Sequence, residues 1–219
     1  MASSANRPGH MEHNLDLTVR DVLGLMQSRV MTETRYFGIP TLKFPIDFWV
    51  YQEIVVETTP DFVVEIGNYH GGSALALAHL CDCLGKGHVI ACDLSHQHVP
   101  ERVRKHPRIT LVEGDACGSF ERIVKLIGGD ATVLVIEDSS HTYENTLAVL
   151  RKYARLVKPG QYFIVEDGIC HHGLAIGPNP GPYEAIETFL AENEEFEADR
   201  SKESFLLTWN PKGYLRRKC

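Results

Sequence analysis

Carboxylates at the ends of five short apolar runs are the residues of this chain most able to do chemistry. The runs are "FVVEIG", "HVIACD", "RITLVEGD", "ATVLVIED" and "QYFIVED", and the acids in or directly after them are Glu65, Asp93, Asp115, Asp138, Glu166 and Asp167. If the runs are parallel strands of one sheet, their carboxyl ends share the edge at which α/β folds bind ligands. Helix capping explains any single acid, but this many acids at one edge indicate a binding site.

The glycine-rich turn after the first run narrows the choice of ligand. In "DFVVEIGNYHGGSALALAHL", a dinucleotide fingerprint would need glycines at positions 67, 69 and 72, but residue 69 is a tyrosine. This disfavours NAD, and the sequence has no G-x-x-x-x-G-K-[ST] phosphate loop. A nucleoside without phosphates fits better, because Asp93 can accept hydrogen bonds from ribose hydroxyls while Glu65 faces a cationic group. S-adenosylmethionine (SAM) is such a ligand.

A sheet is needed to position these residues, and the sequence predicts one. The apolar runs alternate with helical stretches, which predicts an α/β fold with a mostly parallel sheet covered on both faces. The segment "FEADRSKESFLLTWN" has two runs around a polar turn at 200–202, which predicts a C-terminal antiparallel hairpin at the sheet edge. We expect strands at 62–67, 88–93, 108–115, 131–138 and 161–167, and helices near 72–83, 99–105, 118–127 and 142–157.

The chain is expected to have three parts. Residues 1–12 are predicted to be a disordered leader, and residues 13–60 a helical extension with helices at 15–30 and 46–58. Residues 61–219 then form the ligand-binding domain. The apolar face of the first helix and the aromatic segment after it predict a homo-oligomer, although this helix could instead fold back onto its own sheet.

The composition excludes several classes of protein. The chain has 219 residues, of which 43% are hydrophobic, enough for one domain with a full core. Its formal net charge of -7, without a clustered basic stripe, argues against nucleic-acid binding. There is no apolar run of the roughly 20 residues that span a bilayer, and the N-terminus lacks the apolar core of a signal peptide. We therefore expect a soluble, cytoplasmic protein with no membrane partner and with reduced cysteines.

A long stretch of the sequence resembles a known family. The segment "RYFGIPTLKFPIDFWVYQEIVVETTPDFVVEIGNYHGGSALALA" resembles the cephalosporin hydroxylase and rhamnosyl O-methyltransferase family, which shares a K-x-P-x-D-x-W-x-Y-Q-E stretch before an E-I-G-x-x-x-G-G-S turn. The resemblance continues through "VIEDSSHTYENTLAVLRKYARLVKPGQYFIVEDG". The second half is also similar to metal-dependent sugar O-methyltransferases of the macrocin type, in which an acid, a histidine three residues later and an acidic pair supply metal and base.

The resemblance implies a class I, Rossmann-like methyltransferase fold with a mostly parallel seven-stranded sheet. It also implies a Mg²⁺-dependent O-methyltransferase that uses SAM and acts on a sugar-containing or other polyhydroxylated secondary metabolite. Asp138, Glu166 and Asp167 would hold the metal, with His141 beside it. The residues implied to line the SAM pocket are Glu65, Gly67, Asn68, Tyr69, Gly71, Ser73, Asp93, Asp115, Ala116 and Asp138.

Residue chemistry supports the metal independently. Three carboxylates on adjacent strand ends repel one another, and a hard cation with oxygen ligands removes this repulsion. Mg²⁺ suits them, because three protein oxygens leave positions for water and for the hydroxyls of a substrate. Zn²⁺ would instead prefer histidine or cysteine ligands, such as His141. A second zinc set, from Cys81 and Cys83 with the pair at 171–172, is disfavoured because C-x-C in a helix points the thiols to different sides.

His141 is the candidate general base. An acceptor hydroxyl bound at the cation becomes more acidic, a base removes its proton, and its oxygen attacks the methyl group of SAM. An imidazole titrates near neutral pH, although His141 could instead cap a helix. Other aromatic and imidazole side chains that could shape the acceptor pocket are Tyr69, His70, His171 and His172. The glycine- and proline-rich loop 168–182 is long enough to form a lid.

Two further classes of function stay open. A hydroxylase or other oxidoreductase is suggested by the family name, but the sequence offers no two-histidine, one-carboxylate spacing and no haem motif. A noncatalytic SAM-binding subunit would keep Glu65 and Asp93 and lose the metal acids. The chain keeps both sets, which favours an enzyme.

Overall fold

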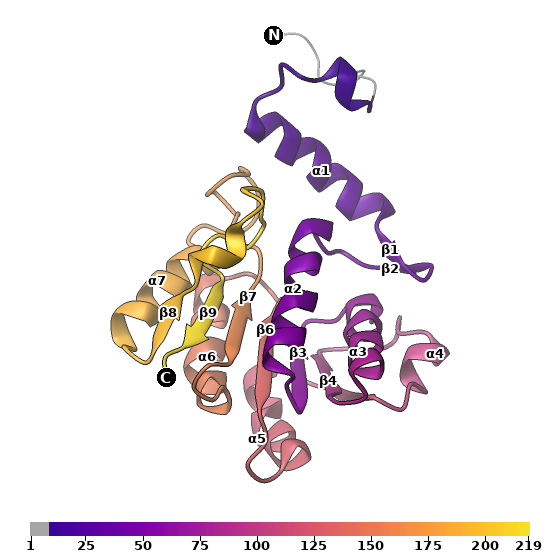
Figure 1. Cartoon of the computed structure of the whole chain (residues 1–219), viewed down its shortest axis with the longest axis vertical. Helices are drawn as coiled ribbons and strands as arrows, with labels where there is room; N and C mark the ends of the chain where they lie inside the picture. Colours follow the sequence, from indigo (N-terminus) through magenta and orange to yellow (C-terminus); the bar gives the residue numbers. More distant parts are fainter. Residues whose placement is uncertain (1–8) are drawn as a thin grey trace.

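A seven-stranded sheet forms the centre of the computed structural model, which describes residues 9–219 (Figure 1). The strand order is β5-β4-β3-β6-β7-β9-β8. The first five strands in this order are parallel, and β9 and β8 extend the β7 edge in antiparallel pairing. The predicted mostly parallel sheet with antiparallel C-terminal strands is therefore confirmed. The strands are β3 (Phe62–Ile66), β4 (His88–Asp93), β5 (Ile109–Glu113), β6 (Val133–Glu137), β7 (Tyr162–Val165), β8 (Phe196–Ala198) and β9 (Tyr214–Arg217).

Helices cover both faces of this sheet, as predicted. Successive side chains of a strand point to opposite faces. Val63 belongs to the apolar cluster that includes α2, α3 and α4, and Val64 belongs to the cluster that includes α5, α6 and α7. The helices are α1 (Val19–Glu33), α2 (Pro45–Thr58), α3 (Gly72–Leu84), α4 (Glu101–Arg104), α5 (Ala116–Ile127), α6 (Tyr143–Tyr153) and α7 (Pro182–Glu192). Short 3-10 turns occur at Met11–His13, Ala154–Leu156 and Arg200–Glu203, and β1 (Arg35–Tyr36) pairs with β2 (Ile39–Pro40).

The predictions for the N-terminal parts of the chain and for α7 have different outcomes. Residues 1–8 of the predicted leader lie outside the described residues, and Met11–His13 form a short 3-10 helix. Helix α2 packs against the sheet beside α3, and the proposed division of the chain at residue 60 stays a prediction. Helix α7 was not predicted, although its start signals are Pro182 in the first turn and Glu184, whose carboxylate accepts the Gly181 N–H at the start of the helix.

The predicted second strand of the C-terminal hairpin, the run "FLLTWN", is not formed, and this part of the prediction is wrong. Strand β8 pairs with β9, with Ala198 opposite Leu215, so the run "FLLTWN" is not a strand. The physical reason is Asp47 of α2, whose carboxylate accepts hydrogen bonds from the Thr208 hydroxyl at 2.6 Å and from the Trp209 N–H at 2.8 Å. These bonds hold the run against α2 instead of at the sheet edge.

Asp47 also ties α2 to the last strand. The Tyr214 hydroxyl donates to Asp47 at 2.9 Å, and the carboxylate is 4% exposed. Burial disfavours the charged form more than these hydrogen bonds favour it, so the pKa of Asp47 is raised to about 6. Asp47 is therefore a buried acceptor on which several backbone and side-chain donors depend.

We expect Asp47→Ala to lower the free energy of unfolding by about 2–4 kcal/mol, because it leaves buried donors unpaired. The folded pKa lies above the unfolded value, so the stability gained by protonating Asp47 is complete below about pH 4 and is lost as pH rises through about 6. The difference between the parent protein and the variant should therefore be about 1–1.5 kcal/mol larger at pH 5 than at pH 8. Urea unfolding followed by circular dichroism measures this, with exposed Asp130→Ala as the control. Equal differences at both pH values would contradict the prediction.

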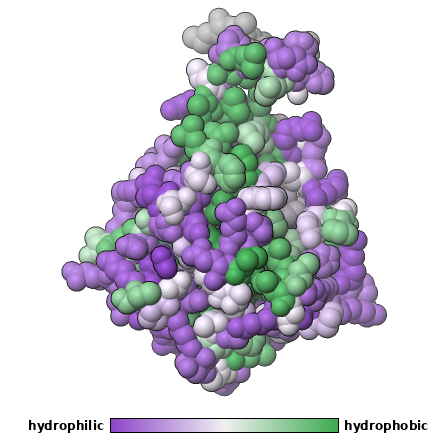
Figure 2. All heavy atoms as spheres, viewed as in Figure 1, coloured by the Kyte–Doolittle hydropathy of each residue, from purple (hydrophilic) through white to green (hydrophobic). Residues whose placement is uncertain are grey.

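Helix α1 lies across the end of the sheet at which the parallel strands finish (Figure 1). Its inner face packs Leu23 and Val30 into a small apolar cluster with Trp209. Val19 and Leu25 of this helix are 54% and 45% exposed, and apolar side chains gather over this part of the surface in Figure 2. The predicted homo-oligomer rests on this face and stays a prediction. Within residues 9–219, no helix is both long and apolar enough to cross a membrane.

Candidate active site

A cavity of about 530 Å³ lies at the carboxyl ends of the parallel strands, within the size range of small-molecule sites. The β3–α3 turn and the ends of β4 and β5 form one side. The ends of β6 and β7 line a second part, and the segment 40–43 lines a third. Helix α1, through Gln27 and Met31, and the loop after β7, through Cys170 and Ile176, close the remaining wall.

The β3–α3 turn is shaped by left-handed backbone conformations. Gly67 has φ 83° and Gly71 φ 77°, and Tyr69 between them has φ 45°. A Cβ on Gly67 would lie 1.9 Å from the carbonyl oxygen of Asp138, so only glycine lets the turn pack against the end of β6. This glycine thus serves close backbone packing within the protein. One carboxylate oxygen of Asp93 accepts the N–H groups of Asn68 and Tyr69, both at 2.8 Å.

Most residues predicted to bind the cofactor line this cavity. Only Glu65 and Gly71 do not; the lining residues are Gly67, Asn68, Tyr69, Ser73, Asp93, Asp115, Ala116 and Asp138. The Asn68 side chain is 3% exposed, and its amide oxygen and nitrogen have no hydrogen-bond partner within residues 9–219. Buried polar groups are rarely left unpaired, so this amide is available to a ligand.

Asp115 has a structural role at the same edge. Its carboxylate accepts the Gly118 N–H at 2.7 Å and caps α5. Helix capping, the alternative explanation for single acids at this edge, therefore applies to Asp115.

Lys43 is the residue of the site that the sequence analysis missed. Its ammonium donates to Asp138 and to Glu166, and it lies 3.9 Å from Glu65. Lys43 is 7% exposed. Burial alone would lower its pKa, but the charges of the three acids together raise the pKa above its ordinary value. Lys43 therefore carries a permanent positive charge inside the acidic cluster.

Glu65 lies fully buried behind the turn. Neither of its carboxylate oxygens accepts a hydrogen bond from residues 9–219. Burial raises the pKa of Glu65 to about 7, against the lowering effect of Lys43. The buried position places Glu65 out of the cavity lining, although it was predicted to contact SAM.

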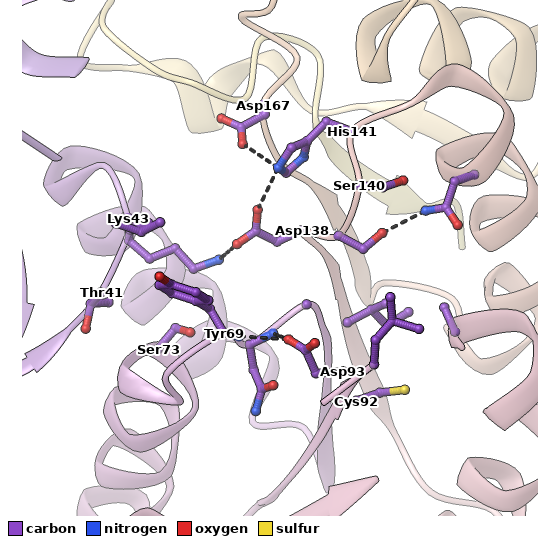
Figure 3. A pocket seen from close by; sticks show the side chains of 18 of the residues that line it. Thr41, Lys43, Tyr69, Ser73, Cys92, Asp93, Asp138, Ser140, His141 and Asp167 are labelled. Carbon is purple, nitrogen blue, oxygen red and sulfur yellow. Dashed lines mark hydrogen bonds and ion pairs between the residues drawn. The ribbon is translucent and has the colours of Figure 1, made fainter. Parts of the chain in front are cut away.

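Asp138, His141 and Asp167 come together on the other side of the cavity (Figure 3). The His141 Nε2 lies 3.3 Å from Asp167 and 3.9 Å from Asp138. The alternative that His141 caps a helix is wrong, because the Thr142 side chain caps α6. Burial raises the pKa of Asp167 to about 6, against the lowering effect of His141. His141 and Asp167 both have positive φ, of 57°.

This group fits a divalent cation by its donors. One ligand atom from each of Asp138, His141 and Asp167 lies within 4.8 Å of the others, and within residues 9–219 this is the one group of its kind. Two carboxylates and one imidazole are suitable ligands for a hard or intermediate cation. Glu166 is not part of the group, because its carboxylate contacts Lys43. The candidate zinc set with Cys81 and Cys83 is not formed either.

The remaining predicted histidines lie away from the cavity lining. His70 contacts the ring of Tyr69. His171 lies 3.2 Å from the Gly177 carbonyl, and His172 lies 2.6 Å from Glu184. Of the aromatic and imidazole residues proposed for the acceptor, the structure brings only Tyr69 to the cavity.

Comparison with known proteins identifies the family. The family model described as Rhamnosyl O-methyltransferase/CmcI matches residues 28–218. The chain belongs to this family. The rhamnosyl O-methyltransferase of Mycobacterium tuberculosis is 35% identical over 195 residues, covering 86% of this chain and 80% of the relative. That of Mycobacterium leprae is 33% identical over 196 residues, covering 86% and 85%.

A solved member of the Rhamnosyl O-methyltransferase/CmcI family shows the fold. The CmcI structure described as its Mg-SAM form superposes with a TM-score of 0.65 and 26% identity, covering 85% of this chain and 77% of that one. The chain therefore has the class I methyltransferase fold.

Lys43 stands in the K-x-P-x-D stretch of the family, and this stretch is the sequence signal that could have pointed to it. Its partners, however, are 95 and 123 residues away in the sequence.

Proposed function

We propose that the protein is a SAM-dependent O-methyltransferase that requires Mg²⁺ or a similar divalent cation. Its acceptor is a hydroxyl of a sugar-containing or other polyhydroxylated secondary metabolite. One observation carries the proposal: a single cavity is lined by the turn that Asp93 orders and by the group of Asp138, His141 and Asp167. The names of the mycobacterial relatives and the Mg-SAM form of CmcI support it.

The cofactor half of the cavity suits a nucleoside. Asp93 uses one oxygen to hold the turn and directs its other oxygen toward the loop at Ser95, whose N–H lies 3.4 Å away. A weak bond of this length is easily replaced by ribose hydroxyls. The unpaired Asn68 amide adds a donor and an acceptor. These groups would orient SAM with its methyl group toward Asp138.

We expect Asp93→Ala to weaken SAM binding by about 1–3 kcal/mol, since it removes ribose contacts and leaves the Asn68 and Tyr69 N–H groups unpaired. Isothermal titration calorimetry with SAM measures this change. A separate titration of the parent protein with NAD should give no heat of binding. The matched control is Glu113→Gln. Glu113 lies on β5 and pairs with Asp93 in the sheet register, and this variant should bind SAM normally. Tight NAD binding with none for SAM would contradict the cofactor assignment.

The reaction half of the cavity supplies a base and its partner. Asp138 and Asp167 would hold the cation, which when bound makes an acceptor hydroxyl more acidic. The His141 Nε2 can take the hydroxyl proton, and Asp167 at 3.3 Å orients the ring and stabilises its protonated form. The acceptor oxygen then forms a bond to the methyl carbon as the methyl–sulfur bond breaks. The products are the methyl ether, S-adenosylhomocysteine and protonated His141.

Mass spectrometry of reactions with SAM and MgCl₂ tests the function. A panel of rhamnosides, other glycosides and phenols should include acceptors that gain one methyl group. A hydroxylated product instead would favour the alternative of an oxidoreductase, against which the donor set argues: two carboxylates and one imidazole differ from the two-histidine, one-carboxylate triad of non-haem iron oxygenases. SAM binding without turnover of any acceptor, with intact metal binding, would leave the noncatalytic subunit as the better explanation.

A further inference from the structure

The Lys43 ammonium lies where the carboxylates of the site converge. It contacts Asp138 and Glu166 directly and Glu65 at 3.9 Å, and Figure 3 shows it pointing at Asp138 from the opposite side of the cavity to His141. The exposed fractions of the Lys43, Glu65 and Glu166 side chains are 7%, 0% and 8%. A buried cation among acids offsets repulsion that would otherwise destabilise the cluster.

The chain around Lys43 holds it in place. Phe44 is 2% exposed and stacks on Trp209, with ring centroids 5.2 Å apart and planes 12° apart. Thr41 packs on the start of α3, where a Cβ on Gly72 would lie 1.9 Å from its hydroxyl. The packing of its two neighbours therefore fixes the segment that carries Lys43, and the ammonium is held beside the acids.

Asp138 is shared between two positions for a cation. One of its oxygens accepts from Lys43, and the other lies toward His141 and the candidate metal group. Glu166, directly before Asp167 in the sequence, is bound to Lys43 and stands outside that group. A metal ion held by the candidate group and the Lys43 ammonium would therefore share the Asp138 carboxylate.

We propose that Lys43 is a resident cation that competes with the divalent metal for Asp138, and so sets the affinity of the site. This inference rests on the proposed function in one respect, which is that Asp138, His141 and Asp167 bind the divalent metal. Lys43 acts here as a positioning residue. In the metal-free chain it keeps the cluster neutral enough to stay folded, and it keeps the metal weakly held and exchangeable.

The test measures metal binding without turnover. Calorimetry with Mg²⁺ and Mn²⁺ compares the parent protein with Lys43→Met, Lys43→Arg and the double variant Lys43→Met with Glu166→Gln. Removing the ammonium should tighten metal binding by about tenfold or more, because a positive charge next to the ligands is lost. The arginine variant keeps the charge and should bind metal like the parent. The double variant removes one charge of each sign and should return to within about threefold of the parent.

Thermal unfolding gives a second readout if Lys43→Met folds poorly without metal. The rise in Tm on adding Mg²⁺ should be larger for Lys43→Met than for the parent, and the double variant should recover the parent's metal-free Tm. Metal binding by Lys43→Met that equals or is weaker than the parent's would overturn the inference and leave the proposed function standing. Binding by Lys43→Met alone would support the inference and overturn the metal requirement. Binding by neither protein would overturn both.

Discussion

Asp167→Asn is expected to abolish methyl transfer, lowering turnover by about 10³-fold or more, while SAM affinity changes by less than about twofold. Asp167 contributes one carboxylate to the candidate metal group and is the partner of His141 at 3.3 Å. Asparagine removes the charge with little strain, because it tolerates the left-handed backbone found here at φ 57°. The proposed cofactor contacts lie on the β3–α3 turn and at the end of β4, away from the substitution.

The same result should be obtained by removing the metal. EDTA should inactivate the parent protein and Mg²⁺ should restore it, whereas Mg²⁺ should not restore Asp167→Asn. Asp130→Asn, at a side chain that is 99% exposed, is the matched control and should keep full activity. Calorimetry with SAM and with Mg²⁺ separates the two binding events. Full-rate methyl transfer in EDTA would show that the acids serve only the protein structure.

The fold could be predicted from the sequence to a large extent because its signals are local. Continuous β-branched runs are typical of buried parallel strands, and all five parallel strands, β3 to β7, fall within the predicted ranges. The second hairpin strand could not be predicted in this way. "FLLTWN" has strand propensity, but Asp47, about 160 residues earlier, captures Thr208 and Trp209. Tertiary hydrogen bonds override propensity at such places.

The sequence predicts those site residues whose positions follow directly from the ends of the parallel strands. Parallel pairing places Asp93 and Asp138 at one edge whatever the loops do, and both line the cavity. What the strand ends do not determine is where each side chain of an acidic pair points. Glu166 turns toward Lys43 and Asp167 toward His141, and both residues follow the end of β7, where Asp167 has a left-handed backbone of φ 57°. Lys43 stands in a family stretch, but nothing local shows that it meets acids 95 and 123 residues away in the sequence.

His141 is close enough to Asp138 and Asp167 to be either the base or a metal ligand, and the two roles predict different kinetics. Mg²⁺ prefers oxygen ligands, which favours the base. A base that is removed slows turnover without changing metal binding. A ligand that is removed weakens metal binding, and excess metal then restores part of the activity.

We therefore expect His141→Asn to lower kcat by about 10²–10⁴-fold, with Mg²⁺ affinity within about threefold of the parent and no rescue by excess Mg²⁺. Asparagine again suits the positive φ of 57°. His171→Asn is the matched control: it also has positive φ, of 58°, and it does not line the cavity. It should keep kcat within about twofold. If Mg²⁺ affinity falls with kcat in His141→Asn and excess Mg²⁺ restores turnover, His141 is a ligand and the proton must leave by another group.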